Sequence, residues 1–93
     1  MDNNFSYFKK YLIQNGVSAK SVKFYVSDVR MFIKWTEKTT SEKKVTKELF
    51  ESYESFLKRS HLPTQTVNRK LSSLRKYANF LFKNKLIDIN LKL

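Results

Sequence analysis

The strongest structural signal in this sequence is the apolar pattern between Thr64 and Lys85. Apolar residues recur there at alternating spacings of three and four positions, as Val67, Leu71, Leu74, Ala78 and Leu81. Because an α-helix completes a turn roughly every 3.6 residues, this spacing places all of them on one side of a helix. Pro63 interrupts the preceding chain, and Thr64 can cap the free backbone N–H groups of a first turn. The pattern therefore predicts a long helix over about residues 65–85.

Three further helices follow from similar apolar periodicity, at about residues 4–15, 19–38 and 47–59. Gly16 stands where a left-handed residue would end the first helix, and Ser18 and Thr46 stand where side-chain oxygens would cap the next two. The 93 residues include one Gly and one Pro, and 41% of them are apolar, a composition that fits helices around a single core. We therefore predict an all-α fold, a compact bundle of four helices, in one domain spanning residues 1–93.

The net charge indicates a polyanionic partner. Nineteen Lys and Arg residues oppose eight Asp and Glu residues, giving a formal charge of +11. Such an excess favours nucleic acid, with an anionic membrane surface as the weaker candidate. No apolar run approaches the roughly 18 residues that a membrane-spanning helix needs, and the first residues lack the basic and apolar regions of a signal peptide. We therefore expect a cytoplasmic protein that does not bind membranes.

Helical-wheel positions concentrate the positive charge on two helices. In the second helix, the arc opposite the apolar side carries Lys20, Lys23, Ser27, Arg30 and Lys34. In the fourth helix, the side opposite the apolar spine carries Gln65, Arg69, Ser72, Lys76, Asn79 and Lys83. Neither stripe contains an acid, and the acids are expected to lie away from both. The stripes therefore forgo the stabilisation that opposite charges four residues apart give an exposed helix.

Two interpretations of these stripes are possible, solubilising surfaces or a nucleic-acid footprint. The footprint is favoured because Arg and Lys can reach guanine, Gln and Asn can pair with adenine, and Ser or Thr can hold phosphates. Four apolar residues near the stripes also need a partner, namely Phe24, Met31, Trp35 and Phe80. They could pack against the first or fourth helix. Alternatively, Phe24 could touch thymine methyls or sugars, while Met31 and Trp35 meet a neighbouring subunit or domain.

No arrangement of residues indicates catalysis or metal binding. The sequence has no Ser-His-Asp set, phosphate-binding loop or pair of suitably spaced carboxylates, and its five tyrosines are interpreted as core aromatics. It has no Cys, and its one histidine, His61, cannot hold a metal by itself and is expected in an exposed turn. We therefore expect no cofactor, no metal site and no enzymatic activity from this chain by itself.

Two stretches together resemble a known family. The first is SAKSVKFYVSDVRMFIKW, from Ser18 to Trp35, and the second is TQTVNRKLSSLRKYANFL, from Thr64 to Leu81. They resemble the SAM-like core-binding domain of tyrosine recombinases, the integrase and Xer-like enzymes, and the helix order is similar over about residues 3–90. This resemblance implies a four-helix domain that forms one half of a C-shaped clamp around duplex DNA. A separate catalytic domain is the other half.

The resemblance also implies that the second and fourth helices face the major groove. Together with the wheel, it makes these residues the candidate DNA contacts of the second helix: Lys20, Ser21, Lys23, Phe24, Ser27, Arg30 and Lys34. Those of the fourth helix are Gln65, Thr66, Arg69, Ser73 and Lys76. The family domain commonly ends in Asn-Pro, whereas here Asn90 precedes Leu91, and the family's catalytic residues belong to the following domain. We therefore expect a fragment whose partners are double-stranded DNA, the catalytic domain of the same parent chain and, on DNA, further recombinase subunits.

Other functions remain as alternatives. A stand-alone helix-turn-helix regulator is disfavoured because both basic helices are long. A helical protein-interaction module with a basic surface is the alternative from another class. It would be preferred if the four apolar residues near the stripes formed one exposed patch. A membrane-surface domain is weaker, since the basic and apolar faces occur on several helices that need one another for a core.

Overall fold

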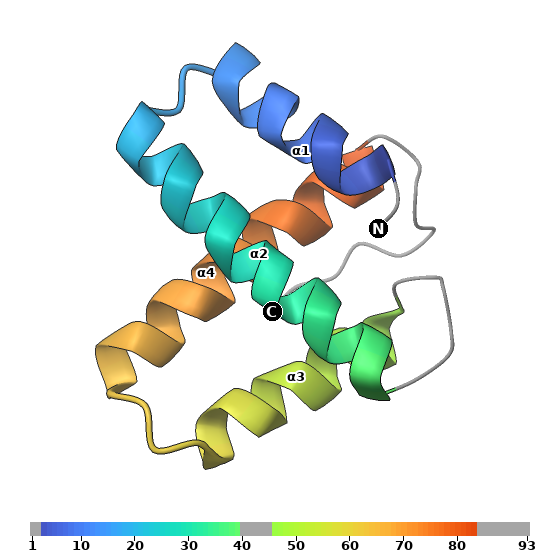
Figure 1. Cartoon of the computed structure of the whole chain (residues 1–93), viewed down its shortest axis with the longest axis vertical. Helices are drawn as coiled ribbons and strands as arrows, with labels where there is room; N and C mark the ends of the chain where they lie inside the picture. The colour runs from blue at the N-terminus through green and yellow to red at the C-terminus, as the bar shows by residue number, and fades with distance from the viewer. Residues whose placement is uncertain (1–2, 40–45, 84–93) are drawn as a thin grey trace.

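A computed structural model describes residues 3–39 and 46–83, which form four helices in the predicted order (Figure 1). They are α1 (Asn3–Gln14), α2 (Ala19–Thr39), α3 (Lys47–Arg59) and α4 (Thr64–Lys83). The predicted all-α, four-helix fold is confirmed, and every helix boundary that can be compared agrees to within one residue. The predicted end of the fourth helix at Lys85, and the Asn90–Leu91 pair, lie outside the described residues.

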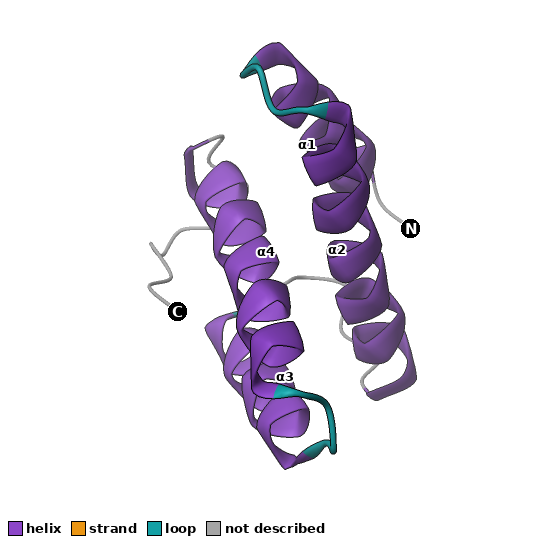
Figure 2. Ribbon diagram, turned by 90° about the vertical axis from the view of Figure 1, so that its left-hand side faces the viewer, coloured by secondary structure: helices purple, strands orange, loops and turns teal. Residues whose placement is uncertain are grey.

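The helices pack as two crossed layers. Figure 2 shows α1 and α2 in one layer and α3 and α4 in the other. The most extensive contact is between α2 and α4, which cross near the middle of the molecule in Figure 1. Both helices begin at the left-hand edge of that view, so their first halves diverge from the crossing towards this edge. The two longest helices thus form a V that opens to one side of the domain.

The turn between α1 and α2 depends on the glycine that the sequence indicated. Gly16 has a φ of 76°, a left-handed conformation that costs residues with a Cβ about 1–2 kcal/mol. Its N–H donates to the carbonyl of Ile13, and the Val17 N–H donates to that of Leu12, both at 3.1 Å. These two bonds satisfy carbonyls that the helix end leaves free. The prediction that Gly16 ends the first helix is confirmed.

Two of the three predicted N-caps are confirmed. Ser18 Oγ accepts a hydrogen bond from the Ser21 N–H, and Thr46 Oγ1 accepts one from the Leu49 N–H, each at 3.2 Å. The prediction for Thr64 was wrong by one residue, because α4 already includes Thr64. The carbonyl of Pro63 accepts the Val67 N–H at 3.1 Å, which puts Pro63 in the cap position.

The core is dominated by aromatic rings from all four helices. Phe8 of α1 meets Tyr77 of α4 edge-on with ring centroids 5.0 Å apart, and Phe32 of α2 stacks on Phe50 of α3 at 4.9 Å. All four are completely buried. Phe80 is also buried, between Phe8 and Tyr11, so the core interpretation of Phe80 is confirmed.

Two expectations about aromatic residues were wrong. Trp35 is half-buried against Tyr53 and Phe56 of α3, at 5.1 and 5.8 Å between ring centroids, rather than against the first or fourth helix. Tyr7 is 54% exposed and is not a core residue. A helical wheel gives the direction of a side chain but not the helix that lies in that direction, which explains both errors.

Candidate nucleic-acid interface

The basic stripe of α2 lies at the surface. Lys20, Lys23, Ser27, Arg30 and Lys34 are all exposed. The first four line an open groove whose other wall is formed by Lys9 and Ile13 of α1. Arg30 also lies over the ring of Phe5, 5.6 Å from its guanidinium carbon to the ring centroid. The α2 stripe is therefore accessible, and it extends from the V towards α1.

The candidate residues of α4 fall into different environments. Gln65 and Arg69 are exposed, while Thr66 and Lys76 are half-buried, as is Ser21 on α2. Ser73 is only 1% exposed, and its hydroxyl donates to Asp28 Oδ2 at 2.7 Å. Because Ser73 lies buried between α2 and α4, it cannot touch a ligand at the surface.

One buried acid links α2 to α4. Asp28 is 2% exposed, and its Oδ1 accepts hydrogen bonds from Arg69 Nη2 at 2.9 Å and from Lys70 Nζ at 3.4 Å. With the Ser73 bond, both carboxylate oxygens are occupied. We call this group, Asp28 with Arg69, Lys70 and Ser73, the seam. The expectation that acids lie away from the stripes was wrong for Asp28, since Arg69 belongs to the α4 stripe.

The seam places opposite charges in a poorly solvated setting. Lys70 is 5% exposed and also contacts the sulfur of Met31, 3.3 Å from its Nζ. Removing such charges from water is costly, so their hydrogen bonds and mutual attraction must offset that cost. The field of Asp28 extends to α3: burial raises the pKa of Tyr53 above 10.0, and the Asp28 charge raises it further. Tyr53 therefore stays neutral well into the alkaline range.

Phe24 and Met31 lie beside the seam and remain exposed. Phe24 is 44% and Met31 49% exposed, although Phe24 carries the Arg69 guanidinium over its ring, at 5.2 Å from guanidinium carbon to centroid. Phe80 is buried and Trp35 is half-buried. The four apolar residues therefore do not form the single exposed patch that would have favoured a protein-interaction module.

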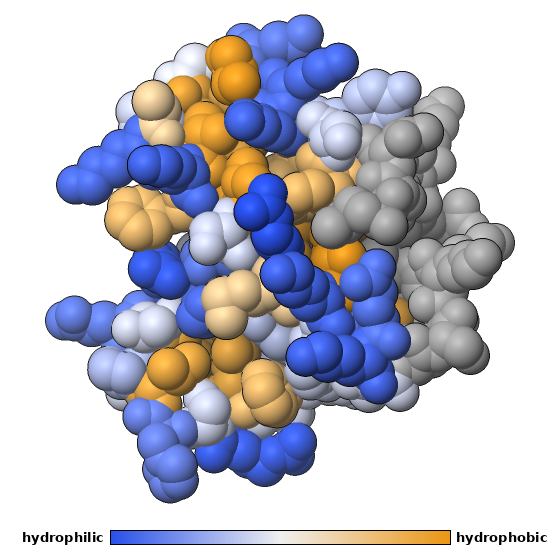
Figure 3. All heavy atoms as spheres, viewed as in Figure 1, coloured by the Kyte–Doolittle hydropathy of each residue, from blue (hydrophilic) through white to orange (hydrophobic). Residues whose placement is uncertain are grey.

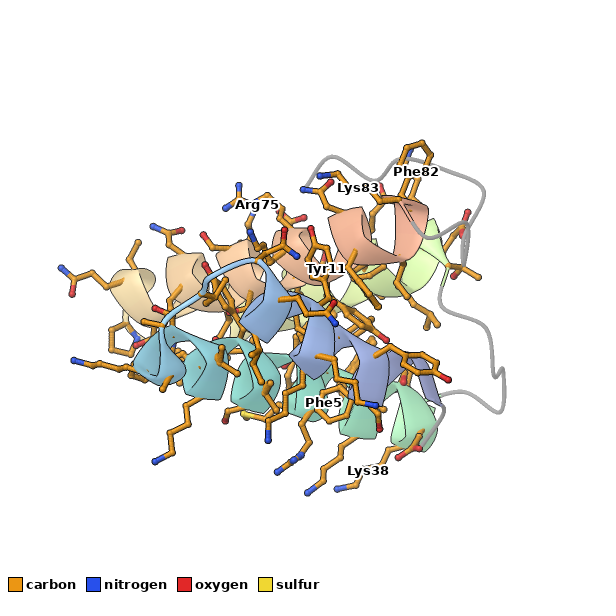
Figure 4. The ribbon with its side chains drawn as sticks, turned by 90° about the horizontal axis from the view of Figure 1, so that it is seen from above. Phe5, Tyr11, Lys38, Arg75, Phe82 and Lys83 are labelled. Carbon is orange, nitrogen blue, oxygen red and sulfur yellow. The ribbon has the colours of Figure 1, made fainter. Side chains whose placement is uncertain are left out.

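The positive charge is spread over more than one side of the domain. Figure 3 shows hydrophilic side chains projecting from the left-hand edge, where α2 and α4 begin, with more apolar ones between them. In Figure 4, Arg75 and Lys83 of α4 lie on the side opposite Lys38 of α2. The two stripes therefore do not form one flat surface, and the V is where the two helices present their first halves together.

The tyrosines and the histidine of the described residues differ in exposure, and Tyr7 is the most exposed of these tyrosines. Tyr53 and Tyr77 are buried, and Tyr11 and Tyr25 are half-buried. His61 is exposed between α3 and α4, as predicted. Within residues 3–39 and 46–83, no group of three His, Cys, Asp or Glu side chains could hold a metal ion. No helix in this part of the chain has the length and apolar character needed to cross a bilayer.

Comparison with known proteins agrees with the all-helical fold of this domain. Residues 5–85 match the family described as "Phage integrase, N-terminal SAM-like domain". The chain belongs to this family, as the two sequence stretches indicated.

Two curated relatives are similar over most of the chain. "Tyrosine recombinase XerC" of Pediococcus pentosaceus is 36% identical over 89 residues, which cover 91% of this chain and 30% of the relative. "TnP I resolvase" of Bacillus thuringiensis is 35% identical over 77 residues, covering 80% of this chain and 27% of the relative. The chain thus spans less than a third of the length of these relatives. No solved structure matches it.

Proposed function

We propose that this domain binds duplex DNA for a tyrosine recombinase, with the DNA in the V between the first halves of α2 and α4. Lys34 and Lys76, in the second halves of the two helices, would extend the contact along the duplex. The observation that carries the proposal is the pair of basic stripes on the two helices that form the V. The similarity to a recombinase and a resolvase supports it. The proposed contacts are Lys20, Ser21, Lys23, Phe24, Ser27, Arg30, Lys34, Gln65, Thr66, Arg69 and Lys76.

The V suits a duplex because each of its two helices can contact a different part of the DNA. A major groove about 12 Å wide admits one helix, so diverging helices can place one element in the groove and the other along the backbone. Both helices also present their N-termini at this edge, where free N–H groups and the helix dipole favour phosphate. Exposed lysines such as Lys20 and Lys23 add point charges for phosphates.

In this proposal, strand cleavage is performed elsewhere in the parent recombinase. The domain would hold the crossover site while a catalytic domain of the same parent chain acts on it, and further recombinase subunits would assemble on the DNA. Binding by this domain by itself would fall in the non-specific range of about 10⁻⁴ to 10⁻⁶ M, because the contacts of the second half of the clamp are missing.

A titration of labelled duplex DNA at several salt concentrations tests the proposal. The test variant changes Lys20, Lys23 and Lys76 to Gln, and the matched control changes the exposed Lys10, Lys38 and Lys47 to Gln. Both lose the same charge. We expect the test variant to lose affinity and to reduce the slope of log K against log salt by about 2 to 3, while the control changes neither as much. Equal effects of the two variants would contradict binding in the V.

The groove between α1 and α2 supports a second candidate function. Its floor includes Val17, Val22 and Val26, and Lys9 and Lys23 stand at its borders. An apolar floor with basic borders could hold an acidic, amphipathic helix of another protein. Absence of salt-dependent binding to any duplex would favour this function over the first.

A further inference from the structure

Arg69 differs from the other basic residues of the V because it is held in place. Its Nη2 donates to Asp28 at 2.9 Å, and its guanidinium lies on the ring of Phe24 at 5.2 Å. The side chain is nevertheless 45% exposed. Arg69 is therefore a surface arginine with two supports, both of which come from α2.

The support from Asp28 is itself rigid. Ser73 donates to the other carboxylate oxygen at 2.7 Å, and Lys70 occupies the same oxygen as Arg69. A carboxylate bound on both oxygens cannot turn freely, so the Arg69 guanidinium has a defined plane. An arginine normally loses about 2 kcal/mol of rotamer entropy when it becomes ordered, and here folding has already ordered much of the side chain.

The contact with Asp28 also changes the ligand that Arg69 favours. Asp28 already neutralises part of the Arg69 charge, so a phosphate gains less from Arg69 than from an exposed lysine without an acidic partner. The O6 and N7 atoms of guanine are neutral acceptors at a spacing that suits two guanidinium donors. Arg69 makes no other hydrogen bond to the described residues, so its remaining N–H groups can serve this purpose.

The ring of Phe24, next to Arg69, favours a second feature of the DNA. Phe24 is 44% exposed and lies against the face of the guanidinium. An exposed aromatic edge at this position matches the methyl group of thymine, which projects into the major groove beside the acceptors of an adjacent guanine. We propose that Arg69 and Phe24 form a base-reading pair that selects a guanine next to a thymine, with Asp28 as the positioning residue. This inference rests on the proposed DNA binding.

The test is a selection of bound duplexes from a randomised library, followed by base-analogue substitution in the enriched duplex. We expect a shared step of guanine beside thymine. Replacing that guanine with 7-deazaguanine should weaken binding about tenfold, and replacing the thymine with uracil should weaken it about threefold. No binding to any duplex would overturn the proposed function as well, whereas binding that ignores both analogues would overturn this inference but leave the function standing.

Variants test whether Arg69 and Asp28 are responsible for the preference for guanine. R69K keeps the charge but has no planar fork, so we expect it to lose the 7-deazaguanine effect. R75K, the same change on the exposed side of α4, is the control and should keep the effect. D28N should reduce the effect without changing the salt slope. Full discrimination by R69K would overturn the inference.

Discussion

The two long flanks of α2 are packed by different kinds of contact. Towards α3, Phe32 and Trp35 meet the rings of Phe50, Tyr53 and Phe56. Towards α4, Asp28 forms the seam. Ring packing gains free energy from buried area and contributes most to stability. A buried ionic group contributes little net stability but requires particular atoms to meet. The comparison teaches that the α3 flank relies on ring packing, whereas the α4 flank, which has the more extensive contact, also contains an ionic group that sets the orientation of α4.

Truncating a ring on the α3 flank should have the largest effect on stability. Phe50 is completely buried and stacks on Phe32. We expect F50A to lower the free energy of unfolding by about 3–5 kcal/mol, measured by urea denaturation, because it leaves a cavity. F56A is the control, since Phe56 is 43% exposed and its loss should cost much less. Similar losses for the two variants would mean that burial does not govern this flank.

Removing the acid of the seam should have the next largest effect. D28A leaves the buried Lys70 without its counter-charge, and we expect it to cost about 3 kcal/mol in urea denaturation. The double variant D28L with K70M should recover most of that loss, because an apolar pair can replace a buried ion pair. It should not recover the preference for guanine. If the double variant still selected guanine, the seam would have no role in orienting Arg69.

Removing the N-cap of α3 perturbs the α3 flank of α2 by a smaller change. Thr46 Oγ1 accepts the Leu49 N–H, so T46A should cost about 1 kcal/mol of stability. T46S keeps the hydroxyl and should cost only a few tenths. Neither variant should change DNA affinity at temperatures where the protein is folded. A loss of affinity in folded T46A would show that the two flanks are not separate in function.

The smallest predicted effect is a pH dependence. The raised pKa of Tyr53 means that the folded state favours the neutral phenol. Its contribution is therefore fully present below the unfolded value of 10.0 and is lost as the pH rises through the higher folded pKa. Between about pH 8 and pH 11, wild type should lose more stability than Y53F, while lysine titration affects both. If the urea midpoints of wild type and Y53F changed with pH in parallel, the predicted role of Tyr53 would be contradicted.

The helices could be predicted because their signals are local. The spacing along Val67, Leu74 and Leu81, and the φ of 76° at Gly16, depend on residues close together in sequence. The cap of α4 was misplaced because a Pro63 carbonyl can serve without any side-chain signal. The helical wheel of α2 likewise predicted that its basic stripe is exposed. Local patterns therefore specify the elements and their exposed sides.

The seam could not be predicted in the same way, because it depends on how two helices cross. Asp28 and Ser73 are 45 residues apart, and no single wheel shows that they face one another. The sequence does contain a signal that was missed: Asp28 is the only acid between Asp2 and Glu37. A carboxylate that stands alone in a long stretch of sequence with many basic residues is a candidate for a structural partner elsewhere in the chain.

The sequence separation within the seam also bears on the order of folding. Asp28 bonds with residues 41, 42 and 45 positions away, whereas each helix and its adjoining turn involve neighbours. Closing a long loop lowers the entropy of the chain before the contact contributes any stabilising free energy, so local contacts form earlier. During synthesis, Asp28 has none of these partners until the ribosome has passed Arg69, and it lacks the last of them until Ser73 has been made. We therefore expect the proposed DNA-binding surface to be among the last parts of the molecule to form.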